Sequence, residues 1–125
     1  MEAKQIHRPI PLVSADGPPY FPVADAASLA PGTGRTVYLR GREYAVFNLN
    51  GEFHAIDNEC PHRGGPLGAG LFEGGKVHCP LHGWAFDPTT GACETKLGCE
   101  IKTYPTKHEH GEVYLCPQPK SVSFP

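Results

Sequence analysis

The sequence predicts an all-β fold, and two observations support this prediction. Glycine and proline are frequent, with 15 and 14 residues among 125, about twice their usual combined share, and both oppose long helices. Short runs of β-forming residues alternate with turn signals, and no stretch keeps a helical hydrophobic period beyond two turns. The length suits one domain, and an apolar content of 39% is sufficient for one modest core.

The chain is expected to consist of an arm, a domain and a tail. Residues 1–20 are predicted to be an extended arm with at most one edge strand near its end, because the prolines that recur there cannot donate to a central ladder. Residues 21–116 are predicted to form the folded domain, within which residues 25–29 suit one helical turn. Residues 117–125 are expected to be a poorly ordered tail.

The first half of the domain is expected to be an antiparallel meander. Asn50 and Gly51 are the strongest hairpin signal in the chain, because both residues tolerate the positive φ angles of a two-residue turn. A second turn is expected at residues 41–42. The strands that these turns connect are predicted at residues 36–40, 44–49 and 53–57.

The second half is expected to carry two shaped loops. Residues 58–70 contain four glycines and two prolines, a composition typical of a loop with special backbone angles. Residues 80–83 are predicted to form a second tight loop. Short strands are expected on either side of it at residues 76–79 and 84–87, followed by a turn at residues 88–91.

The last two strands are expected to form a closing hairpin. Residues 100–105 and 112–116 are predicted to pair around His110 and Gly111.

The bulk charge and the cysteines limit the possible functions. A formal net charge of −2 gives no electrostatic reason to expect a nucleic-acid or membrane partner. The N-terminal residues contain no apolar run long enough for a signal peptide or a membrane span, so we expect a cytoplasmic protein. Five cysteines in a reducing compartment favour a metal site over a disulfide framework.

The soft metal ligands occur as two matched pairs, one in each shaped loop. Cys60 and His62 form a Cys-x-His pair, and Cys79 and His82 form a Cys-x-x-His pair. Two loops that each supply one sulfur and one nitrogen suit a cluster with two unlike irons. A non-redox Cys₂His₂ zinc module is the alternative, although such sites usually pair Cys with Cys and His with His. A Cys–His nucleophilic dyad would not explain the symmetry.

The two segments around these pairs, CPHRGGPLG and CPLHGWAFD, resemble the cluster-binding boxes of Rieske-type proteins. This resemblance implies a Rieske fold of three small antiparallel sheets with two cluster-binding loops at one tip. It also implies a Rieske 2Fe–2S cluster, with Cys60 and Cys79 on one iron and His62 and His82 on the other. The protein would then be a low-potential one-electron carrier that is not catalytic alone.

The resemblance leaves the electron-transfer partner open. The sequences of the first box and of residues 101–105 favour the small subunit of an NAD(P)H-dependent nitrite reductase, whose partner would be a siroheme-containing large subunit. The alternative is the ferredoxin of a ring-hydroxylating dioxygenase, which would serve a terminal oxygenase. A flavin-dependent NAD(P)H reductase is the expected electron donor. A terminal oxygenase itself is not expected, because only a short segment follows the second box.

Residues beside the ligands are expected to shape and cover the site. Gly64, Gly65 and Gly83 are expected to allow tight turns. Trp84 suits either a shield for the cluster or an ordinary core aromatic, and Arg63 suits either a steering charge for an acidic partner or a solvated side chain. An apolar cover that limits water access is predicted from four residues: Pro61, Leu67, Pro80 and Leu81.

The remaining histidines and cysteines are not expected to bind the cluster. His108 and His110 alternate near acidic residues, but hairpin-end histidines commonly face solvent. Cys93 and Cys99 are six residues apart and could approach each other across a turn, but the prediction for both is a free thiol. Cys116 is predicted to be a small buried apolar residue.

High-potential members of the family carry an extra cysteine in each box, and those two cysteines form a disulfide. They also carry hydroxyl donors to sulfur that stabilise the reduced cluster. The corresponding residues here are Gly65, Leu81, Trp84 and Phe86. The resemblance therefore implies a low reduction potential.

Overall fold

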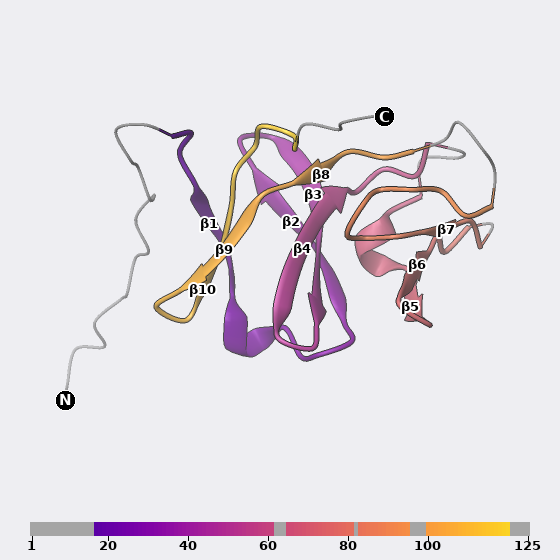
Figure 1. The fold of residues 1–125 in the computed structure, drawn as a ribbon, viewed down its shortest axis with the longest axis horizontal. Helices are drawn as coiled ribbons and strands as arrows, with labels where there is room; N and C mark the ends of the chain where they lie inside the picture. Colours follow the sequence, from indigo (N-terminus) through magenta and orange to yellow (C-terminus); the bar gives the residue numbers. More distant parts are fainter. Residues whose placement is uncertain (1–16, 62–64, 82, 96–99, 121–125) are drawn as a thin grey trace.

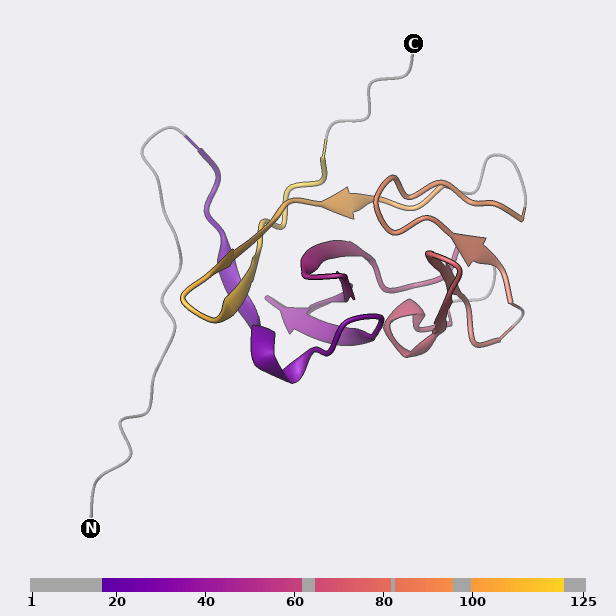
Figure 2. The ribbon, with the colours of Figure 1, turned by 60° about the horizontal axis from the view of Figure 1, so that its bottom comes forward.

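The computed structural model describes residues 17–61, 65–81, 83–95 and 100–120. Three antiparallel sheets make up the fold, which confirms the predicted all-β class. Figures 1 and 2 both show the largest sheet lying between the two smaller ones. Within the described residues, no helix is long and apolar enough to cross a membrane.

The central sheet has the strand order β2–β3–β4–β8. Its strands are β2 (Gly34–Leu39), β3 (Arg42–Leu49), β4 (Glu52–Asp57) and β8 (Thr103–Tyr104). The meander predicted from the sequence is confirmed in its first three strands. The first turn lies at Arg40 and Gly41, one residue earlier than predicted, since these are the two residues with positive φ angles of 52° and 79°.

The second sheet has the order β1–β10–β9 and contains the first strand of the predicted domain. Its strands are β1 (Phe21–Asp25), β9 (Thr106–Glu109) and β10 (Glu112–Leu115). β1 is an edge strand, as proline requires, and the single helical turn η1 (Ala26–Ser28) follows it. The Asp25 carboxylate caps this turn by accepting a hydrogen bond from the Ala27 amide at 3.2 Å.

The prediction for the closing hairpin was wrong about one of its strands. β10 pairs with β9, and β8 pairs instead with β4 in the central sheet. A two-residue turn at His110 and Gly111 places Glu109 opposite Glu112, so the partner strand must be the one that directly precedes the turn. Pro105 lies between β8 and β9, where the chain passes from one sheet to the other.

The third sheet has the order β5–β6–β7 and supports the second cysteine loop. Its strands are β5 (Leu71–Glu73), β6 (Lys76–His78) and β7 (Ala85–Phe86). The sequence predicted the last two but missed β5, as well as the 3-10 turn η2 (Leu67–Ala69) within the first loop. Both are three residues long, too short for a periodic signal.

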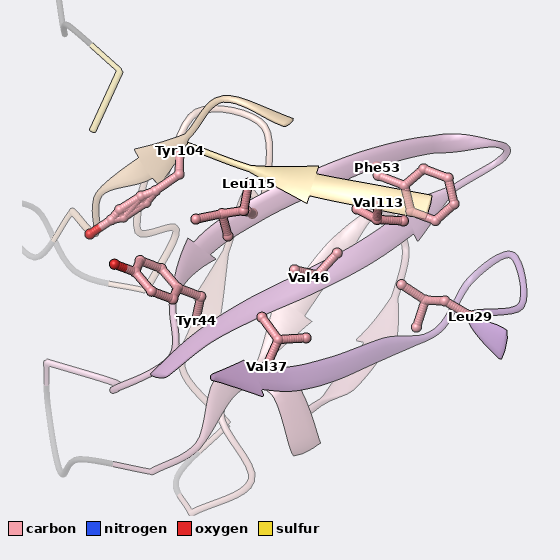
Figure 3. Close-up of a cluster of buried hydrophobic side chains, with 9 residues drawn as sticks. Leu29, Val37, Tyr44, Val46, Phe53, Tyr104, Val113 and Leu115 are labelled. Atoms are coloured by element: carbon pink, nitrogen blue, oxygen red, sulfur yellow. The ribbon is translucent and has the colours of Figure 1, made fainter. Parts of the chain in front are cut away.

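The central sheet is buried on both faces, which divides the core into two clusters. One cluster fills the space between the central sheet and β10, as Figure 3 shows. The other lies between the central sheet and the two cysteine loops. β3 serves both: Tyr44 and Val46 belong to the first cluster, and Ala45 and Phe47 to the second. This alternation explains why β3 is almost continuously apolar.

Candidate metal centre

The first cysteine loop is a narrow hairpin that follows β4. The Leu67 amide donates to the Asn58 carbonyl at 2.6 Å, and the Cys60 amide donates to the Gly65 carbonyl at 2.9 Å. A bridge between Glu59 and Pro66 lies between these two bonds. Cys60 is 1% exposed. The loop therefore places the Cys60 side chain in the core.

The second cysteine loop joins β6 to β7. The Cys79 amide donates to the Trp84 carbonyl at 2.8 Å, and the Gly83 amide donates to the Cys79 carbonyl at 2.9 Å. Gly83 has φ +72°, an angle that favours glycine, so the predicted tight turn is confirmed there. Cys79 is 2% exposed. This loop also directs its cysteine inward.

The two loops touch at Gly65. A Cβ atom added there would lie 2.8 Å from Sγ of Cys79 and 3.0 Å from Cγ of Leu81. Only glycine allows this approach. The first loop therefore packs its backbone against the sulfur of the second, and Cys60 and Cys79 belong to the same buried cluster.

These residues fit an iron–sulfur group. Two buried cysteines of adjacent loops supply soft sulfur ligands, and the backbone near Gly65 comes close to the Cys79 sulfur. His62 and His82 lie outside the described residues, as do Arg63 and Gly64. Among the four predicted ligands, the structure therefore brings together the two cysteines, Cys60 and Cys79, in one buried cluster.

The predicted apolar cover divides into two parts. Leu67 is 0% exposed and packs in the buried cluster that contains Cys60 and Cys79. Pro61 and Pro80 are exposed, and Leu81 is 55% exposed. We refer to these three exposed apolar residues of the two loops, which follow Cys60 and Cys79 in the sequence, as the apolar rim. Trp84 is half-buried and packs against the second core cluster, as an ordinary core aromatic does.

An ion-pair group ties β6 to the segment after β7. Nζ of Lys76 lies 3.1 Å from Glu94 and 3.4 Å from Asp87. Burial opposes ionisation of Asp87, but hydrogen bonds from the Thr89 hydroxyl and amide and the charge of Lys76 outweigh it, so the Asp87 pKa is lowered. These ion pairs brace the strands on either side of the second loop.

The remaining cysteines and histidines lie outside the two loops. Cys116 is a buried free thiol, as predicted. The prediction of a free thiol at Cys93 was wrong, because Cys93 is disulfide-bonded. The backbone of Cys93 also forms an isolated antiparallel β-bridge with Phe86 of β7. Cys99 lies outside the described residues. His108 and His110 are exposed on the β9–β10 hairpin, as expected.

The sequence analysis missed one buried polar residue at the base of the first loop, Asn58. Its position before a glycine-rich loop signals a turn-forming asparagine. Its partners on β2 and β3 carry no sequence signal.

A comparison with family models matches residues 19–105 to the Rieske [2Fe-2S] domain. The chain belongs to the Rieske family. The ferredoxin component of the naphthalene 1,2-dioxygenase/salicylate 5-hydroxylase systems of Ralstonia sp. is 42% identical over 80 residues, which cover 63% of this chain and 77% of that protein. This family membership confirms the resemblance seen in the sequence and implies a Rieske-type 2Fe–2S cluster.

Solved Rieske structures have the same fold. A chain in the complex of reduced oxygenase and oxidized ferredoxin in carbazole 1,9a-dioxygenase has a TM-score of 0.74 at 29% identity, covering 82% of this chain and 97% of that chain. The ferredoxin of carbazole 1,9a-dioxygenase from Nocardioides aromaticivorans IC177 has a TM-score of 0.72 at 30% identity, covering 79% of this chain and 98% of that chain. This Rieske protein is therefore a ferredoxin-type electron carrier. These similar proteins favour a dioxygenase ferredoxin over the nitrite reductase small subunit that we predicted from the sequence.

Proposed function

We propose that this chain is the ferredoxin component of a dioxygenase-type system and passes single electrons to a terminal oxygenase. The observation that carries the proposal is the 42% identity to the Ralstonia sp. ferredoxin component, most of whose length is matched. The solved complex of an oxygenase with a ferredoxin of the same fold supports this class of partner. A flavin-dependent NAD(P)H reductase is the proposed electron donor.

We also propose that Cys60 and Cys79 ligate one iron and His62 and His82 the other. Burial of the two cysteines and the contact of Gly65 with the Cys79 sulfur support the assignment. When bound, a cluster of this type accepts and releases one electron at a time. The chain's own residues hold the thiolates in place and exclude water from them, since Leu67 and Phe86 pack in the same buried cluster.

The proposed Rieske domain comprises residues 21–116, with an arm at residues 1–20 and a tail at residues 117–125. β1 begins at Phe21 and β10 ends at Leu115, which supports both boundaries. The apolar rim of Pro61, Pro80 and Leu81 is the proposed contact surface for the oxygenase, since exposed apolar side chains surround the two loops there.

Metal analysis and reconstitution test this function. The purified protein should contain iron and labile sulfide in equal amounts, give a Rieske EPR signal when reduced, and support naphthalene oxidation with a matching reductase and oxygenase. Replacing His62 or His82 with alanine should abolish the signal and the electron transfer. Stoichiometric zinc with no iron would refute the cluster assignment. Copurification with a siroheme reductase, with no transfer to an oxygenase, would instead refute the dioxygenase role.

A further inference from the structure

The base of the first cysteine loop is held by one buried side-chain amide. Asn58 lies two residues before Cys60 and is 2% exposed. An amide this deeply buried is stable only when its donors and acceptors are paired. Its hydrogen bonds therefore show what it holds in place.

The Asn58 amide joins the loop to two strands of the central sheet. Oδ1 accepts hydrogen bonds from the Thr36 hydroxyl at 3.0 Å and from the Gly68 amide at 2.9 Å. Nδ2 donates to Oε2 of Glu43 at 3.2 Å. Thr36 lies on β2, Glu43 on β3 and Gly68 in η2. One side chain thus connects the end of the loop to both strands beneath it.

The backbones of η2 and β2 are in close contact beside this amide. A Cβ atom added to Gly68 would lie 2.5 Å from the Thr36 backbone nitrogen, so η2 rests directly on β2. From this base, the loop ladder runs from the Asn58–Leu67 hydrogen bond to the Cys60–Gly65 hydrogen bond. A displacement of the base would therefore move the Cys60 backbone.

We propose that Asn58 is a positioning residue for the cluster: through the loop ladder it fixes Cys60, and so governs cluster retention and reduction potential. The inference rests on the proposed role of Cys60 as a ligand. Losing the Asn58 side-chain amide would leave the buried Gly68 amide without its acceptor, and a buried donor without a partner is unfavourable. The amide left unpaired would lie in the first cysteine loop, which carries Cys60.

Asn48 provides a matched control within the same sheet. It is also buried, at 5% exposure, and its amide donates to the Leu29 carbonyl at 2.7 Å and accepts from the Gly51 amide at 2.7 Å. These bonds hold the β3–β4 turn at the opposite end of β4 from the cysteine loop. Replacing Asn48 should therefore destabilise the fold comparably without disturbing the cluster.

The test compares Asn58→Ala, Asn48→Ala and Thr36→Val holoproteins with the wild type. Thermal unfolding reports stability, bleaching of the visible absorbance under chelator reports cluster loss, and voltammetry reports the potential. Asn58→Ala should lose the cluster about tenfold faster or more and shift its potential and EPR signal. Asn48→Ala should leave the bleaching rate, the reduction potential and the EPR signal of the cluster at wild-type values. Thr36→Val, which removes only one donor, should give an intermediate rate even if Asn58→Ala fails to fold.

A rescue experiment separates the hydrogen-bond network from the volume of the side chain. Asn58→Asp keeps the acceptor for Thr36 and Gly68 but places a carboxylate against Glu43, so it should accelerate cluster loss. Adding Glu43→Gln restores a donor at that contact and should return the rate toward wild type.

Equal effects of Asn58→Ala and Asn48→Ala on cluster loss and potential, at equal loss of stability, would overturn the proposal, and so would wild-type cluster readouts in Thr36→Val. A wild-type protein without a Rieske signal, or a His62→Ala variant that keeps one, would instead refute the proposed ligand set. The two failures are therefore distinguishable.

Discussion

Gly65 lies at the contact between the two loops, where high-potential relatives are expected to carry one cysteine of a disulfide. Here an added Cβ would lie 3.0 Å from Cγ of Leu81, the residue at the other disulfide position. The two positions are therefore neighbours in this protein, but van der Waals contact replaces the covalent bond. The loops depend on packing and on the Asn58 network for their relative position.

The reduction potential should be near the low end of the Rieske range of about −150 to +300 mV. Trp84 is half-buried and Phe86 is 0% exposed, and neither carries a hydroxyl that could stabilise the reduced cluster. Protein-film voltammetry near neutral pH measures the potential, which should rise in a Trp84→Ser, Phe86→Tyr double variant if the hydroxyls reach the sulfurs. A wild-type potential in the upper half of the range would contradict this prediction.

His54 should make stability fall as the pH decreases below about 6.5, the ordinary pKa of histidine. Burial, together with the charge of Lys120, lowers the pKa of His54 below its ordinary value of 6.5, and this outweighs the opposite effect of the nearby Glu52 carboxylate. Nε2 of His54 lies 3.7 Å from Oε2 of Glu52 and has no hydrogen-bond partner among the described residues. Below pH 6.5 the unfolded chain binds a proton that the folded protein resists, so stability should fall as the pH decreases toward the folded pKa.

The measurement is the difference in unfolding temperature between the wild type and His54→Gln across this pH range. The contribution of the cluster cancels in this difference. The wild type should lose stability relative to the variant as the pH falls, and a constant difference would count against the argument.

At the scale of elements, β3 connects the two halves of the core. Its Phe47 side chain lies against Gly34 of β2 and stacks on Phe72 of β5 with 5.9 Å between ring centroids. Phe53, on β4, belongs to the other cluster and contacts the His108 ring edge-on. The third sheet, which carries the second cysteine loop, is therefore attached to the central sheet partly through one aromatic stack.

Replacing Phe47 with alanine should cost about 3–5 kcal/mol of stability and also accelerate cluster loss, because the cavity opens beside the third sheet. Phe53→Ala is the control: it should destabilise the fold by a similar amount while the surviving folded protein keeps its cluster. Urea unfolding and chelator-induced bleaching measure the two effects. Equal bleaching rates in both variants at equal stability would show that the two hydrophobic core clusters affect retention of the iron–sulfur cluster equally.

For the whole molecule, the balance of charge and apolar surface predicts how the protein would bind the proposed oxygenase partner. The net charge of −2 is small, whereas Leu81 is 55% exposed on the rim of the loops. Association should therefore depend more on apolar contact than on electrostatic steering.

Electron transfer to the oxygenase should change less than about tenfold between low and high salt. Leu81→Asn should slow it by about tenfold at unchanged potential, since one leucine side chain contributes about 1.5–3 kcal/mol when fully buried. Stopped-flow oxidation of the reduced protein measures both. A steep salt dependence, with no effect of Leu81→Asn, would show that charges control docking.

The sequence by itself determined the all-β class, the three two-residue turns to within one residue, and the two matched boxes, because glycine, proline and ligand spacing act locally along the chain. The partner strand of β10, the burial of Leu67 and the Asn58 network were decided only by the tertiary structure. Each of these depends on which distant segments pack together. That choice is set by burial of both faces of the central sheet, which is a property of the assembled core and not of any short segment.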